Sequence, residues 1–273
     1  MCGRYVMARA TSDLVALGDA ETNEELVLRQ SWNVAPTAEV PILVAHADDG
    51  GAGVTRRIHV ARWGLVPPWA KELSVGSRAF NARSETVASK PTFRAAVRAR
   101  RCAVPVEGYY EWKTPEPGAK GPDGRAAKKQ PYYVHPAGAG DGEGPVIWFA
   151  GLYEWWQDPE AKAAGEDAWV LSTTILTMAA PDADDDDPVL AALGQLHDRM
   201  PVPMDAETMD RWLAPDTLGS AEEADALVGE VCAGAYDVAA GWSLRPVGGA
   251  VGNVRNNGPE LIQEMREQQG TLL

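Results

Sequence analysis

The hydrophobic residues of this chain occur in short runs that are bounded by glycine, proline or charged residues. The runs are Val40–Ala45, Ile58–Trp63, Cys102–Val106, Val146–Ala150 and Trp169–Thr174. Their length and their content of β-branched residues are typical of strands, and they are too short for most globular helices. The pattern therefore predicts that most of the core is built from β-strands.

Helix signals are fewer and lie mainly in the second half. Ser220 begins a Ser-Ala-Glu-Glu capping box, which predicts a helix over 221–232. Asp205 is a suitable N-cap for a helix over 206–213. Two weaker helical candidates are 11–17 and 92–101. Strands and long helices do not alternate regularly, so we expect an α+β fold with a largely antiparallel, barrel-like β core and a few peripheral helices.

Three polar stretches are expected to form surface loops, near 114–130, 136–144 and 181–188. None of them separates two halves that each carry a core, so the sequence predicts a single domain over 1–273. The third stretch contains four consecutive aspartates, Asp184–Asp187. These carboxylates lack the spacing of a calcium loop, and we interpret the run as a solvated loop without a metal.

Composition limits the class of protein. The chain has 273 residues, of which 45% are hydrophobic, which is enough to form a full core and excludes a disordered chain. Its three cysteines, at positions 2, 102 and 232, form no close pair, which excludes a zinc knuckle and a dense disulfide framework. No apolar run is long enough to span a bilayer, and the first residues do not resemble a secretory signal. We therefore expect a cytoplasmic protein.

Charge is distributed unevenly along the chain. The net charge of −14 argues on its face against binding to nucleic acid. However, residues 1–135 contain 19 Lys and Arg against 14 Asp and Glu (+5), whereas 136–273 contain 6 against 25 (−19). Phosphate contacts depend on local cations, so a nucleic-acid site is expected mainly in the first half.

Cys2 carries the most specific chemistry in the sequence. If Met1 is removed, Cys2 has a free α-amine and a thiol on adjacent carbons. Such a 1,2-aminothiol condenses with an aldehyde to an imine, and the sulfur then closes a durable thiazolidine ring. This reaction requires that the sulfur is not isolated in the interior, away from any groove. Taken alone, position 2 favours the ordinary interpretation, in which Cys2 is a small residue that follows a first methionine.

Seven segments together change this interpretation. They are Met1–Tyr5 (MCGRY), Trp32–Thr37 (WNVAPT), Trp63–Trp69 (WGLVPPW), Asn81–Thr86 (NARSET), Gly108–Lys113 (GYYEWK), His197–Pro201 (HDRMP) and Val251–Asn256 (VGNVRN). In this order, the set closely resembles the SRAP family of SOS response-associated peptidases, also called abasic-site processing proteins. The resemblance extends over nearly the whole chain, to about residue 263.

The resemblance implies a protein that crosslinks itself through Cys2 to abasic sites in single-stranded DNA and so protects the lesion. An abasic sugar opens to an aldehyde, which is the partner that an aminothiol needs. The resemblance further implies that Asn81 holds the N-terminal amine or the sugar and that Glu111 moves protons during imine formation. His197 would assist ring opening or closure and bind the adjacent phosphate. No cofactor or metal is implied, and a monomer is expected.

Each of these residues also has an ordinary interpretation. Glu111 lies between two aromatic residues, which would favour acid–base work if the carboxyl is desolvated, but a strand-end glutamate can simply face water. Glu107, four residues earlier, is a rival or a second acid. Asn81 is also a suitable turn cap, and isolated histidines such as His197 are more often packed or exposed than catalytic.

The contacts to DNA are expected from residues within the same segments. The candidates are Arg4, Arg83 and Arg199 for phosphates, and Pro36, Trp69 and Trp112 for unstacked bases. Tryptophan is also a frequent core residue, and the chain has ten. Of the ten, only Trp69 and Trp112 are therefore proposed.

Three other functions remain open at this stage. N-terminal nucleophile amidohydrolases also begin Met-Cys-Gly, but their supporting His-Arg-Gly segment is missing here. A thiol peptidase is suggested by the older family name, and removal of Met1 by the protein itself would account for it. The third alternative is a noncovalent module that binds single-stranded nucleic acid.

Overall fold

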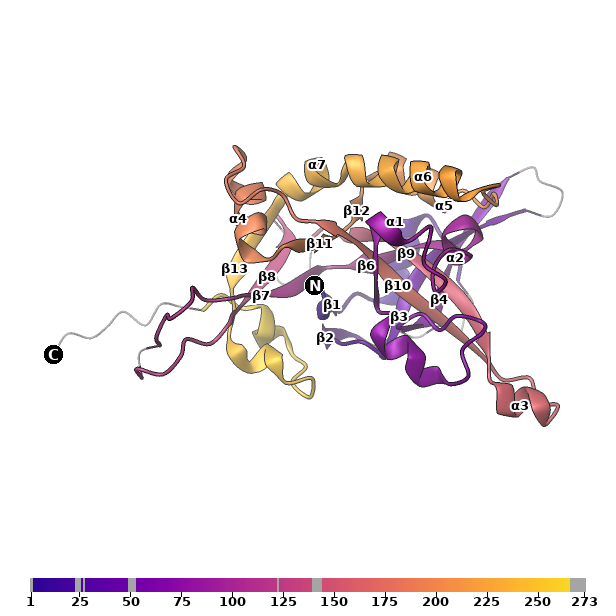
Figure 1. The fold of residues 1–273 in the computed structure, drawn as a ribbon, viewed down its shortest axis with the longest axis horizontal. Helices are drawn as coiled ribbons and strands as arrows, with labels where there is room; N and C mark the ends of the chain where they lie inside the picture. The colour runs from indigo at the N-terminus through magenta and orange to yellow at the C-terminus, as the bar shows by residue number, and fades with distance from the viewer. Residues whose placement is uncertain are drawn as a thin grey trace.

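The computed structural model describes residues 2–22, 26, 28–48, 53–121, 123–138 and 144–265. Its strands are β1 (Tyr5–Met7), β2 (Ser31–Val34), β3 (Glu39–Ala47), β4 (Val54–Trp63), β5 (Asn81–Arg83), β6 (Arg101–Val106), β7 (Gly108–Lys113), β8 (Gln130–Pro136), β9 (Ile147–Gln157), β10 (Trp169–Ala179), β11 (Arg199–Pro201), β12 (Pro203–Met204) and β13 (Trp242–Pro246). Its helices are α1 (Thr11–Gly18), α2 (Ala96–Ala99), α3 (Pro159–Ala163), α4 (Pro188–Leu196), α5 (Ala206–Leu213), α6 (Ala221–Ala233) and α7 (Ala235–Ala240), with 3-10 turns η1 (Leu73–Arg78), η2 (Ser84–Thr86), η3 (Gly249–Gly252) and η4 (Pro259–Ile262). Figure 1 shows their arrangement.

Five strands close into a barrel in the order β10-β4-β3-β6-β9, because β10 pairs with both β4 and β9. All pairs in this ring are antiparallel except the short β10–β4 pair. The interior is filled by fully buried side chains such as Ile42, Val104 and Phe149. The α+β class and the barrel-like, largely antiparallel core that the sequence predicts are confirmed.

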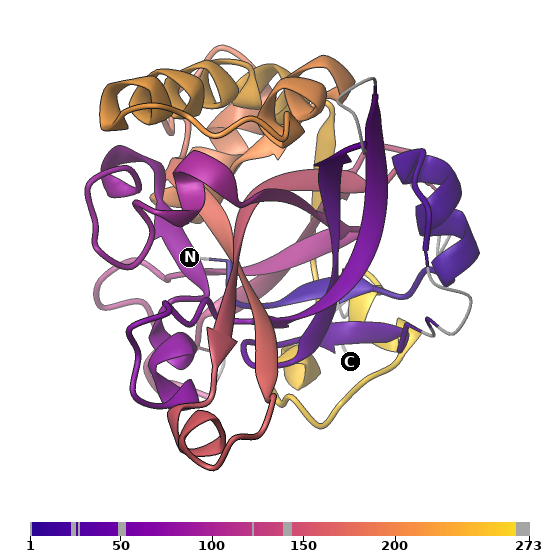
Figure 2. The same ribbon diagram turned by 90° about the vertical axis from the view of Figure 1, so that its right-hand side faces the viewer.

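A second sheet lies beside the barrel, with the strand order β13-β8-β7-β1-β2. The first strand of the chain, β1, is an inner strand next to the edge: Tyr5 is paired with Val34 of β2 on one side and with Tyr109 of β7 on the other. Cys2 precedes β1 and packs into the main core at zero exposure. Figure 2 shows the start of the chain close to the crossing of the barrel strands. The topology therefore places the N-terminus where the two sheets meet.

Helices α5, α6 and α7 cover one side of the barrel, along the top of Figure 1. The predicted caps are present: the Asp205 carboxylate accepts the Thr208 amide at 2.7 Å, and the Ser220 hydroxyl accepts the Glu223 amide at 3.2 Å. Trp212 of α5 is fully buried, and its indole N–H donates to the carbonyl of Cys102 at 3.0 Å. Among the described helices, none has the length and apolar character needed to cross a membrane.

The helix expected over 92–101 is much shorter than the sequence suggests. Only Ala96–Ala99 is helical, and Arg101 already belongs to β6. The reason is the guanidinium of Arg101, which is buried and donates to the carbonyls of Val97, Arg98 and Trp212. These bonds end the helix and fix the start of the strand.

Parts of the three stretches that the sequence predicts as loops are described. Between Lys113 and Gln130 the described residues contain neither a helix nor a named strand. Within 136–144, residues 139–143 lie outside the described part of the chain. At the end of the aspartate run, Asp187 caps α4 by accepting the amide of Val189 at 2.8 Å.

The Trp63–Trp69 segment leaves the barrel at Gly64. Gly64 has a φ of +131°, and a Cβ there would lie 2.5 Å from the carbonyl oxygen of Gly76. Only glycine tolerates both the backbone conformation and this close approach. The contact fixes η1 against the end of β4 and places Trp69 on the surface, where it is 60% exposed.

Candidate functional site

Cys2 is held in place by its backbone. The side-chain amide of Asn81, at the start of β5, donates to the Cys2 carbonyl at 2.8 Å. The thiol itself has no exposed surface, and burial raises its pKa, with the nearby Glu111 carboxylate acting in the same direction. Met1 lies outside the described residues. Both effects favour the protonated thiol over the thiolate.

Glu111 is the carboxylate whose charge acts on Cys2. It lies on β7, where its side chain is 5% exposed and its Oε1 accepts the amide of Trp112 at 3.2 Å. Tyr5 and Tyr109 complete the surroundings: burial raises the pKa of both hydroxyls, and a negative charge on Cys2 would raise them further. A buried carboxylate thus shares a desolvated space with the Cys2 thiol, and the water-facing alternative for Glu111 is wrong.

Glu107, the rival acid, has a different environment. Its carboxylate pairs with Arg9 at 3.1 Å, and its backbone amide donates to the Val6 carbonyl at 2.9 Å. Burial raises the pKa of Glu107, and the Arg9 charge opposes that rise. Glu107 lies between β6 and β7, where the chain passes from the barrel to the second sheet. We interpret this pair as a structural link between N-terminal segment and barrel.

Three of the predicted residues converge at one end of β10. Ile175 and Thr177 of β10 pair with Asn81 and Arg83 of β5, and Ala179 pairs with Arg199 of β11. Arg83 is exposed and has no hydrogen bond or ion pair from its side chain to the described residues. The sheet therefore places Asn81, which touches Cys2, next to a free surface cation.

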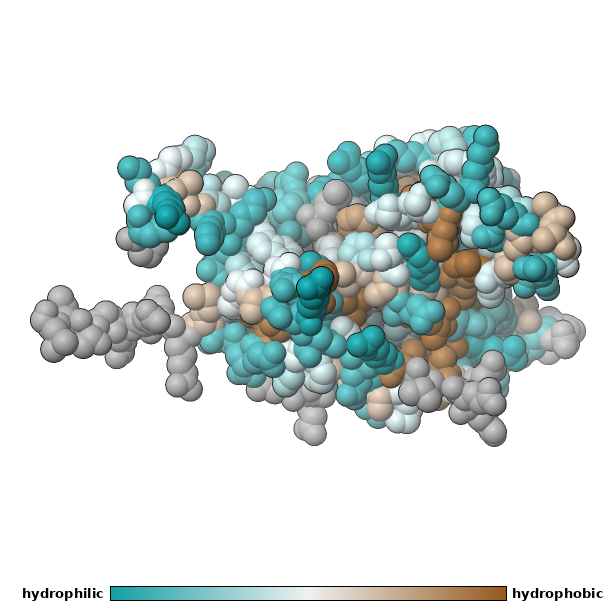
Figure 3. Space-filling view, turned by 90° about the horizontal axis from the view of Figure 1, so that it is seen from below, coloured by the Kyte–Doolittle hydropathy of each residue, from teal (hydrophilic) through white to brown (hydrophobic). Residues whose placement is uncertain are grey.

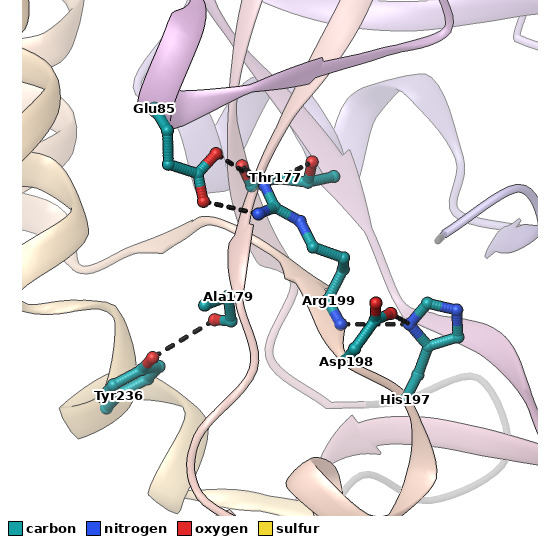
Figure 4. Close-up of polar contacts among 7 residues, drawn as sticks. All are labelled: Glu85, Thr177, Ala179, His197, Asp198, Arg199 and Tyr236. Carbon is teal, nitrogen blue, oxygen red and sulfur yellow. Dashed lines mark hydrogen bonds and ion pairs between the residues drawn. The ribbon is translucent and has the colours of Figure 1, made fainter.

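His197 is the C-cap residue that follows α4, Asp198 separates it from β11, and α4 contacts β7. Its Nδ1 lies 2.6 Å from an oxygen of Asp198 and 3.0 Å from the amide nitrogen of Arg199 (Figure 4). A neutral Nδ1 accepts a hydrogen bond from the Arg199 amide, whereas a protonated Nδ1 donates one to the Asp198 carboxylate. Either bond holds the ring in the same orientation. The side chain is 27% exposed, which leaves the ring accessible to a ligand.

Arg199 is already engaged. It makes a two-pronged ion pair with Glu85 and donates from Nη2 to the carbonyl of Thr177 at 2.7 Å (Figure 4). The hydrogen bond from Arg199 lowers the pKa of Glu85 below the ordinary range of a glutamate. A phosphate contact by Arg199 stays a prediction, and it would require Arg199 to share its guanidinium with Glu85.

This ion pair leads to a pH-dependent stability. Because the folded-state pKa of Glu85 is lowered, its contribution is present at neutral pH and is lost as the pH falls below about 4. We expect Glu85→Gln to lower the free energy of unfolding by less than about 1 kcal/mol at neutral pH, since half of the Glu85 side chain is exposed. Urea unfolding of both proteins at neutral and acid pH measures this, with the exposed Glu166→Gln as control. A difference that does not change with pH would contradict it.

A groove opens beside Asn81. A pocket of about 840 Å³ is lined by Asn81, Phe93, Trp69, Arg78 and Lys90, among others. Trp69 offers an exposed aromatic face, and Arg78 and Lys90 are exposed cations. An exposed ring beside cations is the arrangement that binds single-stranded nucleic acid. Cys2 is buried, but its carbonyl accepts a hydrogen bond from Asn81, and Asn81 lines the groove.

Arg4 contacts other parts of the protein. Its Nη1 donates to Oδ1 of Asn33 and to the carbonyl of Val251, both at 2.8 Å. Asn33 in turn donates to the carbonyls of Asn253 and Asn256, at 3.1 and 2.9 Å. Three of the seven segments found in the sequence are therefore bound together by one network. These hydrogen bonds hold Arg4 against β2 and η3, and a contact between Arg4 and a DNA phosphate stays a prediction.

Pro36 and Trp112 lie apart from each other. Pro36 lines a second groove of about 670 Å³, together with the exposed Arg29 and Arg255. Trp112 is half-buried against a small core cluster that includes Val6 and Tyr110. DNA contacts by Pro36 and Trp112 stay predictions, and Trp112 also packs against this cluster.

Several residues around the site were not singled out from the sequence. They are Tyr5, Tyr109, Glu85, Arg78, Lys90 and Asn33. Four of them lie inside the seven segments, and that position could have identified them: Tyr5, Tyr109, Glu85 and Asn33. The other two, Arg78 and Lys90, reach the groove only through η1 and the turn after β5. Among the described residues, no three His, Cys, Asp or Glu side chains are grouped to hold a metal.

Comparisons with known proteins show which family the sequence is similar to. Residues 1–254 match the family described as SOS response associated peptidase (SRAP). The abasic site processing protein YoqW of Bacillus subtilis is 30% identical over 264 residues, covering 96% of this chain and 99% of the relative. The abasic site processing protein HMCES of Rattus norvegicus is 27% identical over 258 residues, covering 85% and 64%.

A crystal structure of a Bacteroides thetaiotaomicron protein shares the fold. It superposes with a TM-score of 0.69 at 21% identity, covering 97% of this chain and 100% of the other. The match to the SRAP family over residues 1–254 includes the first six sequence segments and the seventh up to Val254. This chain therefore belongs to the SOS response associated peptidase (SRAP) family.

Proposed function

We propose that this protein processes abasic sites in single-stranded DNA by forming a covalent crosslink through Cys2. The observation that carries the proposal is the position of Cys2, whose carbonyl is held by Asn81 while Asn81 also lines the groove with Trp69. The relatives YoqW and HMCES are both named abasic site processing proteins, which supports the same substrate.

The reaction needs both heteroatoms of Cys2. The free α-amine attacks the aldehyde carbon of the opened sugar, water leaves, and an imine forms. The sulfur then adds to the imine carbon, and the thiol proton ends on the ring nitrogen, so that no oxidant or cofactor is consumed. Glu111 is the nearby carboxylate that takes the proton from the amine and delivers it to the departing hydroxyl. His197 and Asn81 orient the sugar.

Burial of the thiol is consistent with a protected precursor. A chain that retains Met1 has no free amine at Cys2, and its sulfur has no exposed surface. Removal of Met1 creates the amine next to the groove that Asn81 lines. We propose that Glu111 and Cys2 also carry out this removal, which is the peptidase activity suggested by the family description. Intact mass spectrometry tests it: wild type should lack Met1, and Glu111→Gln should retain it.

The DNA is proposed to be single-stranded because the groove combines the exposed Trp69 ring with exposed cations, and an unstacked base can stack on such a ring. Arg83, Trp69, Arg78 and Lys90 line or flank its opening. The acidic second half weakens nonspecific binding, so stable capture depends on the covalent step. A cytoplasmic location and a monomeric state remain expectations from the sequence.

A denaturing gel tests the function directly. Purified protein is incubated with a labelled single-stranded oligonucleotide that contains one abasic site, and then heated in detergent. The proposal predicts a labelled band at the mass of the adduct, and no band with an oligonucleotide whose abasic sugar was reduced to an alcohol. A noncovalent binding module or an amidohydrolase gives no such band, and its absence would refute the proposal.

Arg83 provides a prediction for the noncovalent step. Arg83 is exposed and makes no hydrogen bond or ion pair with the described residues. We therefore expect Arg83→Gln to lose about one phosphate contact, which makes the slope of log K against log salt concentration shallower by roughly 0.7. Fluorescence anisotropy over a salt series measures the slope. Arg125→Gln, at a side chain that is 87% exposed in the β7–β8 connection, is the control. An unchanged slope for Arg83→Gln would remove Arg83 from the phosphate contacts.

A further inference from the structure

A third pocket lies outside the reactive site. It has a volume of about 510 Å³ and is lined by residues from β3, β4, η1, β9 and β10. The residues that matter here are Arg62, Glu39, Leu73, Trp155 and Trp169. None of them has a role in the crosslinking chemistry proposed above.

Arg62 lies in this pocket without a partner. Its side chain forms neither a hydrogen bond nor an ion pair with any described residue, and its Nη1 atom is buried. Glu39 is the cross-strand neighbour of Arg62, yet no ion pair joins them. The guanidinium instead lies against the glycine turn, with Nη1 3.4 Å from the position that a Cβ of Gly64 would occupy. A partly buried guanidinium with unused donors is costly unless an acceptor is supplied from outside.

Two exposed tryptophans border the same pocket. Trp155 and Trp169 are 44% and 50% exposed, although tryptophan is usually much more buried. In the β9–β10 ladder, Trp155 pairs with Leu171 and Trp169 pairs with Gln157, so the two rings are diagonal neighbours on the same face. Both rings and the unsatisfied guanidinium line one pocket, which offers stacking for a base and donors for its phosphate.

The pocket borders both grooves already described. Leu73 of η1 lies in the pocket, while its neighbours Glu72 and Ser74 line the groove of Trp69 and Asn81. Thr37 and Glu39 line both this pocket and the groove of Pro36. The β9–β10 hairpin projects with α3 toward the lower side of Figure 1, and the face seen from below carries a band of hydrophobic residues among hydrophilic ones (Figure 3).

We propose that Arg62, Trp155 and Trp169 form a nucleotide subsite that holds an unpaired base of the DNA strand at a distance from the abasic sugar. The inference rests on the proposed function for the choice of ligand. The two rings stack on the base, and the free donors of Arg62 bind a neighbouring phosphate. Exposed Glu39 at the mouth opposes the phosphate, so its charge limits the affinity of the subsite.

The test uses single-stranded oligonucleotides without an abasic site, so that it does not depend on crosslinking. The fluorescent base 2-aminopurine is placed at successive positions, and stacking on tryptophan quenches it. We expect one position to be quenched by the wild type and released in Trp169→Ala. We also expect Trp169→Ala and Arg62→Gln each to weaken binding by about tenfold, and Glu39→Gln to strengthen it.

Arg57→Gln is the matched control, because Arg57 lies on the same strand with a side chain that is 53% exposed. Crosslinking to a short abasic oligonucleotide, too short to reach the pocket, should stay at the wild-type rate in Trp169→Ala. If that crosslink is absent in the wild type as well, the proposed function fails and the subsite is still judged by quenching. Unchanged quenching and unchanged affinity in both Trp169→Ala and Arg62→Gln would overturn the subsite.

Discussion

Cys2→Ser should abolish the heat-stable adduct with abasic single-stranded DNA. The variant is first freed of Met1 with a methionine aminopeptidase, so that it retains the α-amine. The imine then still forms, but a hydroxyl closes a weaker ring and the product hydrolyses. We therefore expect the adduct band to fall to background on a denaturing gel and to reappear when borohydride reduces the imine before heating. The rescue distinguishes loss of the sulfur from loss of the amine.

The control is Cys232→Ser, which removes a half-buried thiol on α6 without touching β1. The unfolding transition of each variant should be measured as well, because Cys2 packs in the main core. A stable adduct from the serine variant, formed without borohydride, would refute the thiazolidine mechanism. Loss of the adduct in Cys232→Ser would mean that the gel reports on folding.

Glu111→Gln, freed of Met1 with a methionine aminopeptidase so that its α-amine is available, should slow crosslinking by roughly 100-fold, the lower end of what a positioned acid–base group contributes. The amide cannot transfer protons during imine formation, yet it preserves the shape of the side chain and can still accept the Trp112 amide. DNA affinity should change little, because Glu111 is buried and has little surface to offer to DNA. Single-turnover gel assays give the rate, and anisotropy gives the affinity.

Glu107→Gln is the matched control for this effect. Glu107 is also a mostly buried glutamate near β7, but its partner is Arg9, and no charge effect of Glu107 on Cys2 is found. We expect it to lower stability while the crosslinking rate of the folded protein stays near wild type. Equal rate losses in the two variants would indicate that Glu111 acts through packing.

The local elements followed from the sequence because their signals are local. The five hydrophobic runs lie within, or begin one residue before, β3, β4, β6, β9 and β10, and the caps at Asp205 and Ser220 begin α5 and α6. The helix over 92–101 failed because the buried guanidinium of Arg101 binds carbonyls from a distant part of the chain. Such long-range satisfaction of a charged group leaves no periodic pattern.

The site shows the same division. The sequence nominated Cys2, Asn81 and Glu111 through short segments, but the contact between Asn81 and the Cys2 carbonyl depends on β5 joining the barrel beside β10. The engagement of Arg199 by Glu85 and of Arg4 by Asn33 was not foreseen, because each pair is joined only when separate segments meet. These contacts turn two expected phosphate ligands into partly structural residues.

By itself, the sequence determined the β-rich class, the capped helices, the uneven charge and the reactive potential of a cysteine at position 2, since each depends on neighbouring residues or on composition. Tertiary structure alone decided that the thiol is buried, that a carboxylate shares its surroundings, and that Arg62 lies unpaired beside two exposed tryptophans. Burial and electrostatic environment are set by which strands become neighbours, and strand neighbours here are far apart in the chain.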